Sequence, residues 1–393
     1  MSEAVELGRF RETIFGRAVK TPGAHGYVAY SPASIPRQVE VTPANMMRLA
    51  DAESALGRLA GAGRLLPAPH LLVNPYLRRE AVASTRIEGT QASLADVFDA
   101  EAGDQPFDAD IEEVVNYVTA MQSGLEKLRS LPFSIRLIRE MHQTILSGDR
   151  GRERQPGAIR TSQNWIGPAG ATIESASFVP PPPHEVGRLL DDLELFVHEP
   201  PQLPPLVQAA LLHYQFETIH PFLDGNGRLG RLLIVFFLVV RDRLPEPLLY
   251  LSPYFEARRD LYYDTLQAVR ERGAFDEWLA LFLGAVRVQA LDAVIRAERL
   301  MDLREQYRSA AQARTRGLAV DLVDLVFEQP VLTSRSVERR FDTVRQSSLR
   351  ALHQLAEAGI LDELREGPRR QLRWQAPEVL RILTEEVDEG SSD

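Results

Sequence analysis

The stretch HPFLDGNGRLGR, residues 220–231, concentrates side chains that could perform acid–base and phosphate chemistry. It contains a histidine, an acid, two glycines around an asparagine, and two arginines three residues apart. An unbroken apolar run, residues 232–240, follows at once. Core packing does not require flexible and charged residues directly before a helix that is predicted to be buried. The stretch therefore predicts a functional site.

The second half of this stretch predicts an anion site. The Gly-Asn-Gly turn at 225–227 can direct its amides inward, and the helix expected over 229–240 adds free N–H groups and the positive end of its dipole. Arg228 and Arg231 are expected on one side of that helix's first turn. Two cations there are unfavourable unless an anion is present, which favours a bound polyphosphate. Asp224 could then hold Mg²⁺, which is usually bound by carboxylates together with phosphate oxygens.

His220 is the candidate acid–base group. Apolar residues recur at helical spacing over 206–219, and Pro221 disfavours the α region for the residue before it, so the helix should end near His220. A lone histidine is more often structural than catalytic. Two rival motifs fail, because the P-loop spacing with its lysine is missing and because Glu217-x-x-His220 is only half of a di-iron carboxylate motif.

The elements that must position these residues are mostly helical. Residues 157–183 differ: they are rich in Gly, Ser and Thr, and we predict a short β-hairpin there, ended by four prolines. A long helical pattern over 275–313 could act as a spacer. The other helices are predicted over Asn45–Gly63, Asn74–Ile87 (with Gly89 as its stop), Asp110–Leu128, Ile135–Leu146 and Leu206–Ile219.

Residues 320–375 form a distinct unit. A short helix, two further helical patterns and two strands around a Gly-Pro wing predict a winged helix-turn-helix. Between 331 and 375 there are nine Arg against six Asp or Glu. Duplex DNA or a protein could be its partner. For DNA, we expect the phosphates to meet Arg345, Arg350, Arg369 and Arg370.

Composition sets limits on the whole chain. Its 393 residues are enough for two or three domains, and 44% hydrophobic with 25% charged residues is ordinary for a soluble globular protein. The absence of cysteine excludes disulfides and thiol nucleophiles. The net charge of −10 argues against a surface that grips nucleic acid throughout. No signal-peptide pattern precedes the first helix, and the run 232–240 is too short to span a bilayer, so we expect a cytoplasmic protein without a membrane partner.

HPFLDGNGRLGR resembles the signature of the Fic family, H-P-F-x-[D/E]-G-N-G-R-x-x-R, at every defined position. STRIEG, residues 84–89, resembles the family's inhibitory motif, and QNWIG…FVPPPP resembles its target-docking flap. The resemblance implies a mainly α Fic-fold helical core with a short β-hairpin flap and a C-terminal winged helix-turn-helix. We assign residues 1–105 to an N-terminal region with the inhibitory helix, 106–290 to the Fic core, 291–319 to a helical linker, 320–380 to the winged unit and 381–393 to a tail.

The resemblance also implies an activity, transfer of AMP from ATP to a Tyr, Thr or Ser hydroxyl of a target protein. His220 would take the hydroxyl proton, Asp224 would bind Mg²⁺ between the α- and β-phosphates, and Arg231 would hold the γ-phosphate. Kinases of the wider superfamily carry Ala and Lys in place of the two loop glycines, so the intact glycines favour AMP transfer. The residues implied for nucleotide binding are Gly225, Asn226, Gly227, Arg228, Arg231 and Tyr263.

Glu88, with Ser84 and Gly89, would form the inhibitory motif by pairing with Arg231. Tyr263 has two interpretations: it lies near the adenine, as the resemblance implies, or it is a buried core tyrosine at helical spacing. The alternative functions are removal of AMP from a modified protein, and a DNA-binding regulator whose core senses ATP. Similar proteins often dimerise, and we expect a homodimer that could also modify itself.

Overall fold

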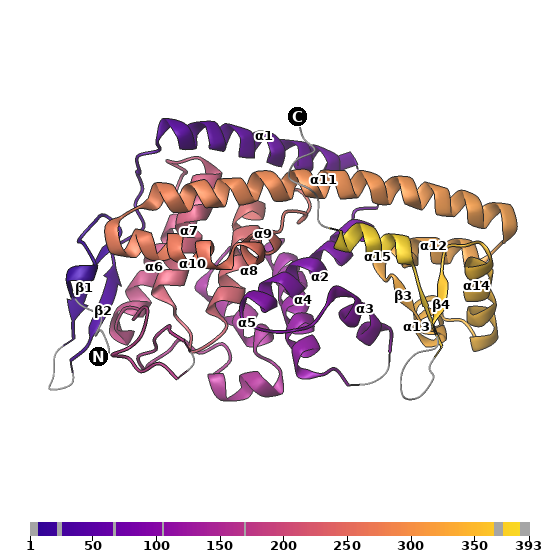
Figure 1. Cartoon of the computed structure of the whole chain (residues 1–393), viewed down its shortest axis with the longest axis horizontal. Coiled ribbons are helices and arrows are strands. Elements are labelled where there is room, and N and C mark those ends of the chain that lie inside the picture. The colour runs from indigo at the N-terminus through magenta and orange to yellow at the C-terminus, as the bar shows by residue number, and fades with distance from the viewer. Residues whose placement is uncertain are drawn as a thin grey trace.

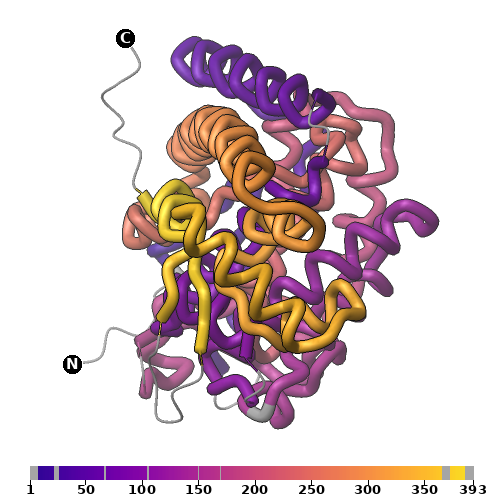
Figure 2. The backbone as a smooth tube through the Cα atoms, turned by 90° about the vertical axis from the view of Figure 1, so that its right-hand side faces the viewer, coloured from indigo at the N-terminus to yellow at the C-terminus, as the bar shows by residue number. Residues whose placement is uncertain are grey.

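Two long helices, α1 (Pro43–Leu65) and α11 (Phe275–Arg314), run side by side along one face of a mainly helical molecule (Figure 1). They remain adjacent after a quarter turn of the view (Figure 2). This computed structural model describes residues 7–21, 26–65, 68–103, 106–168, 170–364 and 372–385. Within them, α11 alone is long and apolar enough to cross a membrane, but 56% of its most apolar window is buried inside the protein.

The elements follow the chain in this order. The N-terminal part holds η1 (Leu7–Arg9), β1 (Gly16–Lys20), β2 (Val28–Pro32), α1, α2 (His70–Ile87), α3 (Leu94–Ala102), α4 (Ala109–Leu128), α5 (Ile135–Ile145) and η2 (Asp149–Arg154). Next come α6 (Pro183–His198), α7 (Pro205–Ile219), α8 (Asn226–Val240), α9 (Ser252–Ala257), α10 (Arg259–Arg272) and α11. Last are α12 (Leu318–Glu328), β3 (Val331–Leu332), α13 (Ser334–Phe341), α14 (Arg345–Glu357), β4 (Asp362–Leu364), β5 (Arg373–Gln375) and α15 (Pro377–Thr384).

Helices α7 and α8 form the centre of the fold. Residues 206–219 of α7 are all buried, and α8 is buried over most of its length. A helix that is apolar on every side must be surrounded by other elements, and α4, α5, α6 and α11 supply that cover. The loop that joins α7 to α8 therefore stands on the most rigid part of the molecule.

A glycine sets how closely α4 approaches α8. A Cβ added to Gly124 would lie 2.1 Å from Cζ of Phe236 and 2.8 Å from the sulfur of Met141. Only a residue without a side chain fits there, because packed interiors leave no room for an added methyl group. This contact fixes α4 against the helix that begins at the predicted site.

The C-terminal unit packs on α2, the helix that leads to Glu88, mainly through α12. Thr333 donates a hydrogen bond of 2.8 Å to the carbonyl of Ala102 at the end of α3. Arg79 of α2 pairs with Asp292 of α11 at 2.7 Å, and the fully buried Arg296 shares the same carboxylate at 2.8 Å. A single core continues through both parts of the chain.

The predicted helices are present within a few residues of their expected ends. Glu88 caps α2, and Gly89 follows with φ 109°, as its predicted stop requires. Helix α8 begins three residues earlier than predicted, so Asn226 and Gly227 belong to its first turn and only Gly225, with φ 75°, makes the turn. Helix α11 runs without interruption from the predicted core into the predicted linker.

The prediction of two regular strands in the flap hairpin is wrong for the described residues. One isolated antiparallel bridge, Ile166 with Phe178, is its only described strand pairing. The four prolines cannot donate to a ladder, and the Gln163 side chain donates to the carbonyls of Asn164 and Pro180 instead. An unpredicted hairpin, β1–β2, supports the flap, since the amide of Tyr30 donates to the carbonyl of Val179 at 2.9 Å.

The C-terminal elements occur in the order expected of a winged helix-turn-helix, α12, β3, α13, α14, β4 and β5, with the strands arranged β3-β5-β4. Arg345 and Arg350 are exposed on α14. Arg369 and Arg370, at the predicted wing, lie outside the described residues. The winged helix-turn-helix and its partner stay predictions.

Gly124→Ala should lower the free energy of unfolding by about 1–3 kcal/mol, because the new methyl group overpacks the contact with Phe236. Gly57→Ala, in α1, is the matched control: nothing lies within 4 Å of its added Cβ. This change should raise stability by about 0.5–1 kcal/mol, as alanine is the better helix former. Urea unfolding measures both, and equal effects of the two substitutions would contradict the close α4–α8 contact.

Candidate active site

His220 lies at the end of α7, where the chain leaves the helix. It caps α7 with φ 48° and ψ 61°, and its amide still donates to the carbonyl of Phe216 at 3.0 Å. This left-handed conformation is costly for a residue with a side chain. Neighbouring groups must therefore hold it.

Arg160 is the main holder of that turn. It is 1% exposed, and it donates to the carbonyls of His220 at 2.9 Å, Ile219 at 3.3 Å and Pro181 at 2.6 Å. Asn164 adds a bond of 2.8 Å to the carbonyl of Phe222. Burial lowers the pKa of Arg160 to about 10, which leaves it cationic at neutral pH. One buried cation thus ties the base of the flap to the turn of His220.

His142 holds the other side of the loop. Its Nδ1 accepts from the amide of Gly157 at 2.8 Å, so the proton is on Nε2, which donates to the carbonyl of Asp224 at 2.9 Å. Its ring stacks on Phe222 with centroids 3.7 Å apart. Asn226 closes the loop internally, because its side chain both accepts from the amide of Phe222 and donates to its carbonyl, each at 2.9 Å.

Arg231 is buried against the end of α2. It is 2% exposed, and it donates to Oγ of Ser84 at 3.0 Å, to the Ser84 carbonyl at 2.8 Å and to Oε1 of Glu88 at 2.8 Å. Burial raises the pKa of Glu88, but the charge and hydrogen bond of Arg231, together with the charge of Arg228, more than offset this, and the pKa lies below its ordinary value. A Cβ on Gly227 would lie 2.3 Å from Oε1 of Glu88. This glycine therefore makes room for the Glu88 carboxylate.

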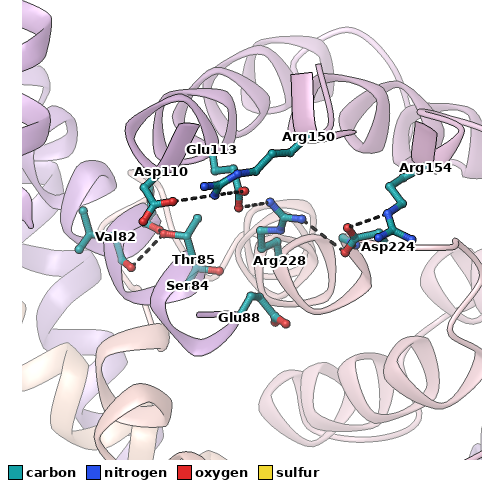
Figure 3. Close-up of polar contacts among 12 residues, drawn as sticks. Val82, Ser84, Thr85, Glu88, Asp110, Glu113, Arg150, Arg154, Asp224 and Arg228 are labelled. Carbon is teal, nitrogen blue, oxygen red and sulfur yellow. Dashed lines mark hydrogen bonds and ion pairs between the residues drawn. The ribbon is translucent and has the colours of Figure 1, made fainter. Parts of the chain in front are cut away.

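Arg228 points elsewhere, although it starts from the same turn. Its Nη1 donates to Oε2 of Glu113 at 2.9 Å, and its Nη2 lies 3.6 Å from Oδ1 of Asp224. Arg154 lies 4.0 Å from the other oxygen of Asp224, whose side chain is 46% exposed. The predicted pair of arginines thus has different closest carboxylates: Arg231 pairs with Glu88 at the end of α2, and Arg228 pairs with Glu113 of α4. Figure 3 shows Arg228 with Glu113 and Asp224.

The imidazole of His220 is held neutral. Burial and, after it, the charges of Arg160 and Arg270 lower its pKa to about 3. Burial also raises the pKa of Glu217, one helical turn before it, to about 7. A neutral imidazole can accept a proton.

Tyr263 stands on α10 with 38% of its surface exposed, so the interpretation as a buried core tyrosine is wrong. Partial burial and the charge of Glu88 raise its pKa to about 12. The phenol of Tyr263 therefore lies within electrostatic range of Glu88. Its predicted place near an adenine stays a prediction.

Buried polar atoms without partners indicate what the site could bind. Among the described residues, Nη1 of Arg231, Nε of Arg228 and Nδ1 of His220 are buried and have no hydrogen-bond partner. Unsatisfied buried donors are costly, and two guanidinium N–H groups beside a helix N-terminus fit phosphate oxygens. The exposed carboxylate of Asp224 is the group here that could hold Mg²⁺, although the described residues contain no cluster of three or more such ligands.

Sequence reasoning missed Arg160, His142, Asn164 and Glu113. Arg160 and Glu113 act over separations of 60 and 115 residues, and no local motif marks such contacts. His142 occupies the apolar face of an amphipathic helix and reads as a core residue. Asn164 lies within QNWIG, where the resemblance pointed to the flap and not to the loop.

Two family models and several known proteins are similar to parts of this chain. Residues 46–126 match the Fic/DOC family N-terminal domain, and residues 132–238 match the Fic/DOC family domain. Protein adenylyltransferase fic-1 of Caenorhabditis elegans is 32% identical over 139 residues, which are 35% of this chain and 25% of that protein. Protein adenylyltransferase Fic of Drosophila grimshawi is 27% identical over 195 residues, 48% of this chain and 37% of that protein.

A solved structure of a Fic family protein from Desulfovibrio desulfuricans G20 has a TM-score of 0.57 at 21% identity, covering 86% of this chain and 97% of that chain. At that identity the likeness concerns the fold alone. The matches to the two curated proteins span less than half of their length.

The buried His142 predicts a pH dependence of stability. Burial lowers its pKa from 6.5 to about 4, so the unfolded chain takes up the proton first. The stability that neutral His142 supplies is present in full above its unfolded pKa and is lost as the pH falls. Between pH 7 and 5 this loss should amount to about 2 kcal/mol.

His142→Gln, which cannot titrate, should show a correspondingly shallower loss in urea unfolding at pH 7, 6 and 5. His184→Gln, at an exposed position, serves as the control and should follow the wild type. Parallel pH profiles for wild type and His142→Gln would show that His142 is not held neutral.

Proposed function

The chain belongs to the Fic/DOC family, and from that premise we propose that it is a protein adenylyltransferase. It would transfer AMP from ATP to a Tyr, Thr or Ser hydroxyl of a target protein. The observation that carries the proposal is the loop from His220 to Arg231. There a neutral imidazole, a helix N-terminus and two buried guanidinium groups with unpaired N–H donors converge.

In the proposed reaction the target hydroxyl oxygen attacks the α-phosphorus of ATP. The bond from that phosphorus to the bridging oxygen of the β-phosphate breaks, and pyrophosphate leaves. His220 takes the hydroxyl proton. Arg160 and His142 act through the loop, because Arg160 holds the left-handed turn at His220 and His142 holds the loop at Asp224.

The nucleotide would lie across the start of α8. The first amides of the helix, fixed by Asn226, would face the α-phosphate, and Arg228 and Arg231 would neutralise the outer phosphates. Asp224 would hold Mg²⁺, which would supply charge neutralisation between the phosphates. Catalysis of this kind consists of positioning and electrostatic stabilisation.

The pair between Glu88 and Arg231 supports autoinhibition. A guanidinium bound to a carboxylate at 2.8 Å is not available to a γ-phosphate. ATP would then settle with its α-phosphate out of line for attack. Competent binding requires Glu88 to leave the guanidinium, so the active arrangement is a minority state.

The alternative enzyme reaction is removal of AMP from a modified protein, with Glu88 positioning water. DNA binding at the C-terminal unit, a homodimer, self-modification and a cytoplasmic location also stay predictions. A regulator whose core only senses ATP would need no base at His220.

His220→Ala should reduce AMP transfer by about 10²–10⁴-fold, the range for loss of acid–base catalysis, while ATP affinity changes little. Transfer is measured by mass spectrometry of labelled target or self-modified chain, and affinity by calorimetry. Equal transfer by wild type and variant would remove His220 from the mechanism and favour the ATP-sensing regulator.

Glu88→Gly should raise AMP transfer by about 30- to 150-fold, the factor for releasing a minority state held back by about 2–3 kcal/mol. Adding Arg231→Ala should remove most of the gain, since the freed guanidinium is what binds the phosphate. If removal of AMP is the main reaction, the same glycine substitution should abolish it. A folded Glu88→Gly variant that transfers no faster than wild type would exclude the inhibitory role.

A further inference from the structure

We propose that Glu113 of α4 is a positioning residue for the nucleotide site: it sets where the Arg228 guanidinium lies and so keeps Asp224 accessible. This inference rests on the proposed function, because it concerns how the same site receives ATP and Mg²⁺. Nothing in the sequence motif points to Glu113, which lies 115 residues before its partner.

The contact between Glu113 and Arg228 is nearly buried. The side chain of Arg228 is 5% exposed and that of Glu113 is 20% exposed, and the bond from Nη1 to Oε2 is 2.9 Å long. A buried charge that loses its partner is strongly unfavourable. Arg228 must therefore keep a carboxylate near it, and the only other one within ion-pair distance in the described structure is Asp224, at 3.6 Å.

Arg228 thus stands between two carboxylates (Figure 3). The shorter contact goes to Glu113, so the guanidinium is drawn toward α4 and away from the loop. Asp224 is left with two long cation contacts, 3.6 Å to Arg228 and 4.0 Å to the exposed side chain of Arg154. A carboxylate without a close cation is the one that can ligate Mg²⁺.

A second arginine holds Glu113 in place. Nη1 of Arg150 lies 3.2 Å from Oε1 of Glu113 and 2.6 Å from Oδ1 of Asp110 (Figure 3). The other oxygen of Asp110 accepts from the amide of Gln91 at 2.8 Å. Arg150 is 57% exposed and so contributes modestly. Even so, this network connects the chain just after the inhibitory motif with the guanidinium of Arg228.

The backbone supports the same arrangement. Gly124 lets α4 approach α8 closely, and this approach brings the N-terminal half of α4 beside the first turn of α8. A small cavity, lined among others by Glu112, Glu113 and Asn116, opens there beside Asp224 and Arg228. The cavity is bordered by both the Arg228 and the Asp224 side chains.

Loss of the Glu113 charge should therefore shift the Arg228 guanidinium toward Asp224. With Asp224 as its only close carboxylate, the guanidinium would pair with it and occupy the Mg²⁺ ligand. ATP would bind more weakly when Mg²⁺ is present, whereas the proton transfer at His220 would be unaffected. A purely structural ion pair would change stability and leave nucleotide affinity as it is.

The test uses the full chain carrying His220→Ala as the parent protein, so that ATP is not consumed during calorimetry. The other substitutions are added to this parent. Glu113→Ala should weaken ATP binding by about tenfold or more with Mg²⁺, equal to about 1.4 kcal/mol, and by a clearly smaller factor with excess EDTA. Glu113→Gln, which keeps one acceptor but no charge, should fall between. Glu126→Ala, which removes an exposed carboxylate from the same helix, should bind as the parent does.

Each outcome decides a different point. If the parent binds no ATP with or without Mg²⁺, the proposed function fails. If the parent binds and Glu113→Ala binds equally well, or loses the same factor with and without Mg²⁺, the positioning role of Glu113 is overturned. If circular dichroism shows that Glu113→Ala is unfolded, Glu113→Gln decides alone, and parent-like affinity in that variant overturns the inference.

Discussion

The burial of Arg231 is the constraint on which the rest of the site depends. A guanidinium that is 2% exposed has lost most of its hydration, and a carboxylate or a phosphate is the partner that best offsets this cost. In this structure Glu88 meets that need, and Ser84 supplies two more acceptors from the same turn of α2. Under the proposed function, the anion bound to this arginine, the Glu88 carboxylate or a phosphate, would decide whether the site is closed or ready for a nucleotide.

The same requirement ties the site to the rest of the molecule. Helix α2 carries Glu88 at one end, and along its length it packs against α4, α9 and α12. Its Arg79 joins a buried network with Asp292 and Arg296, which in turn reaches the carbonyls at the end of α15. The C-terminal unit therefore supports α2, the helix that carries Glu88.

Side-chain hydrogen bonds to the backbone hold the loop from His220 to Arg231 itself. His220 has a backbone conformation that it would not adopt by preference, and the bonds from Arg160, Asn164 and His142 to neighbouring carbonyls hold that loop. These three side chains come from the flap base and from α5. A preformed loop costs no ordering when the substrate arrives, which is the principal way such a site can lower a barrier.

The central motif could be predicted because its signals are local. Pro221 after a helical pattern located the end of α7, and Ser84 and Glu88, four residues apart, proved to meet one arginine. The rest of the site could not be predicted from the sequence, because it depends on tertiary contacts. The different directions of Arg228 and Arg231 follow from where α4 and α2 lie, and the missing flap ladder follows from prolines and from side chains that take the backbone acceptors.

The most direct measurement uses two ATP samples, one labelled at the α-phosphorus and one at the γ-phosphorus, with the Glu88→Gly chain and protein substrate. The account predicts stable label on protein only from the α-phosphorus, together with the mass increase of one AMP on a hydroxyl side chain. Label from the γ-phosphorus, or no label on any protein while the chain binds ATP, would contradict it.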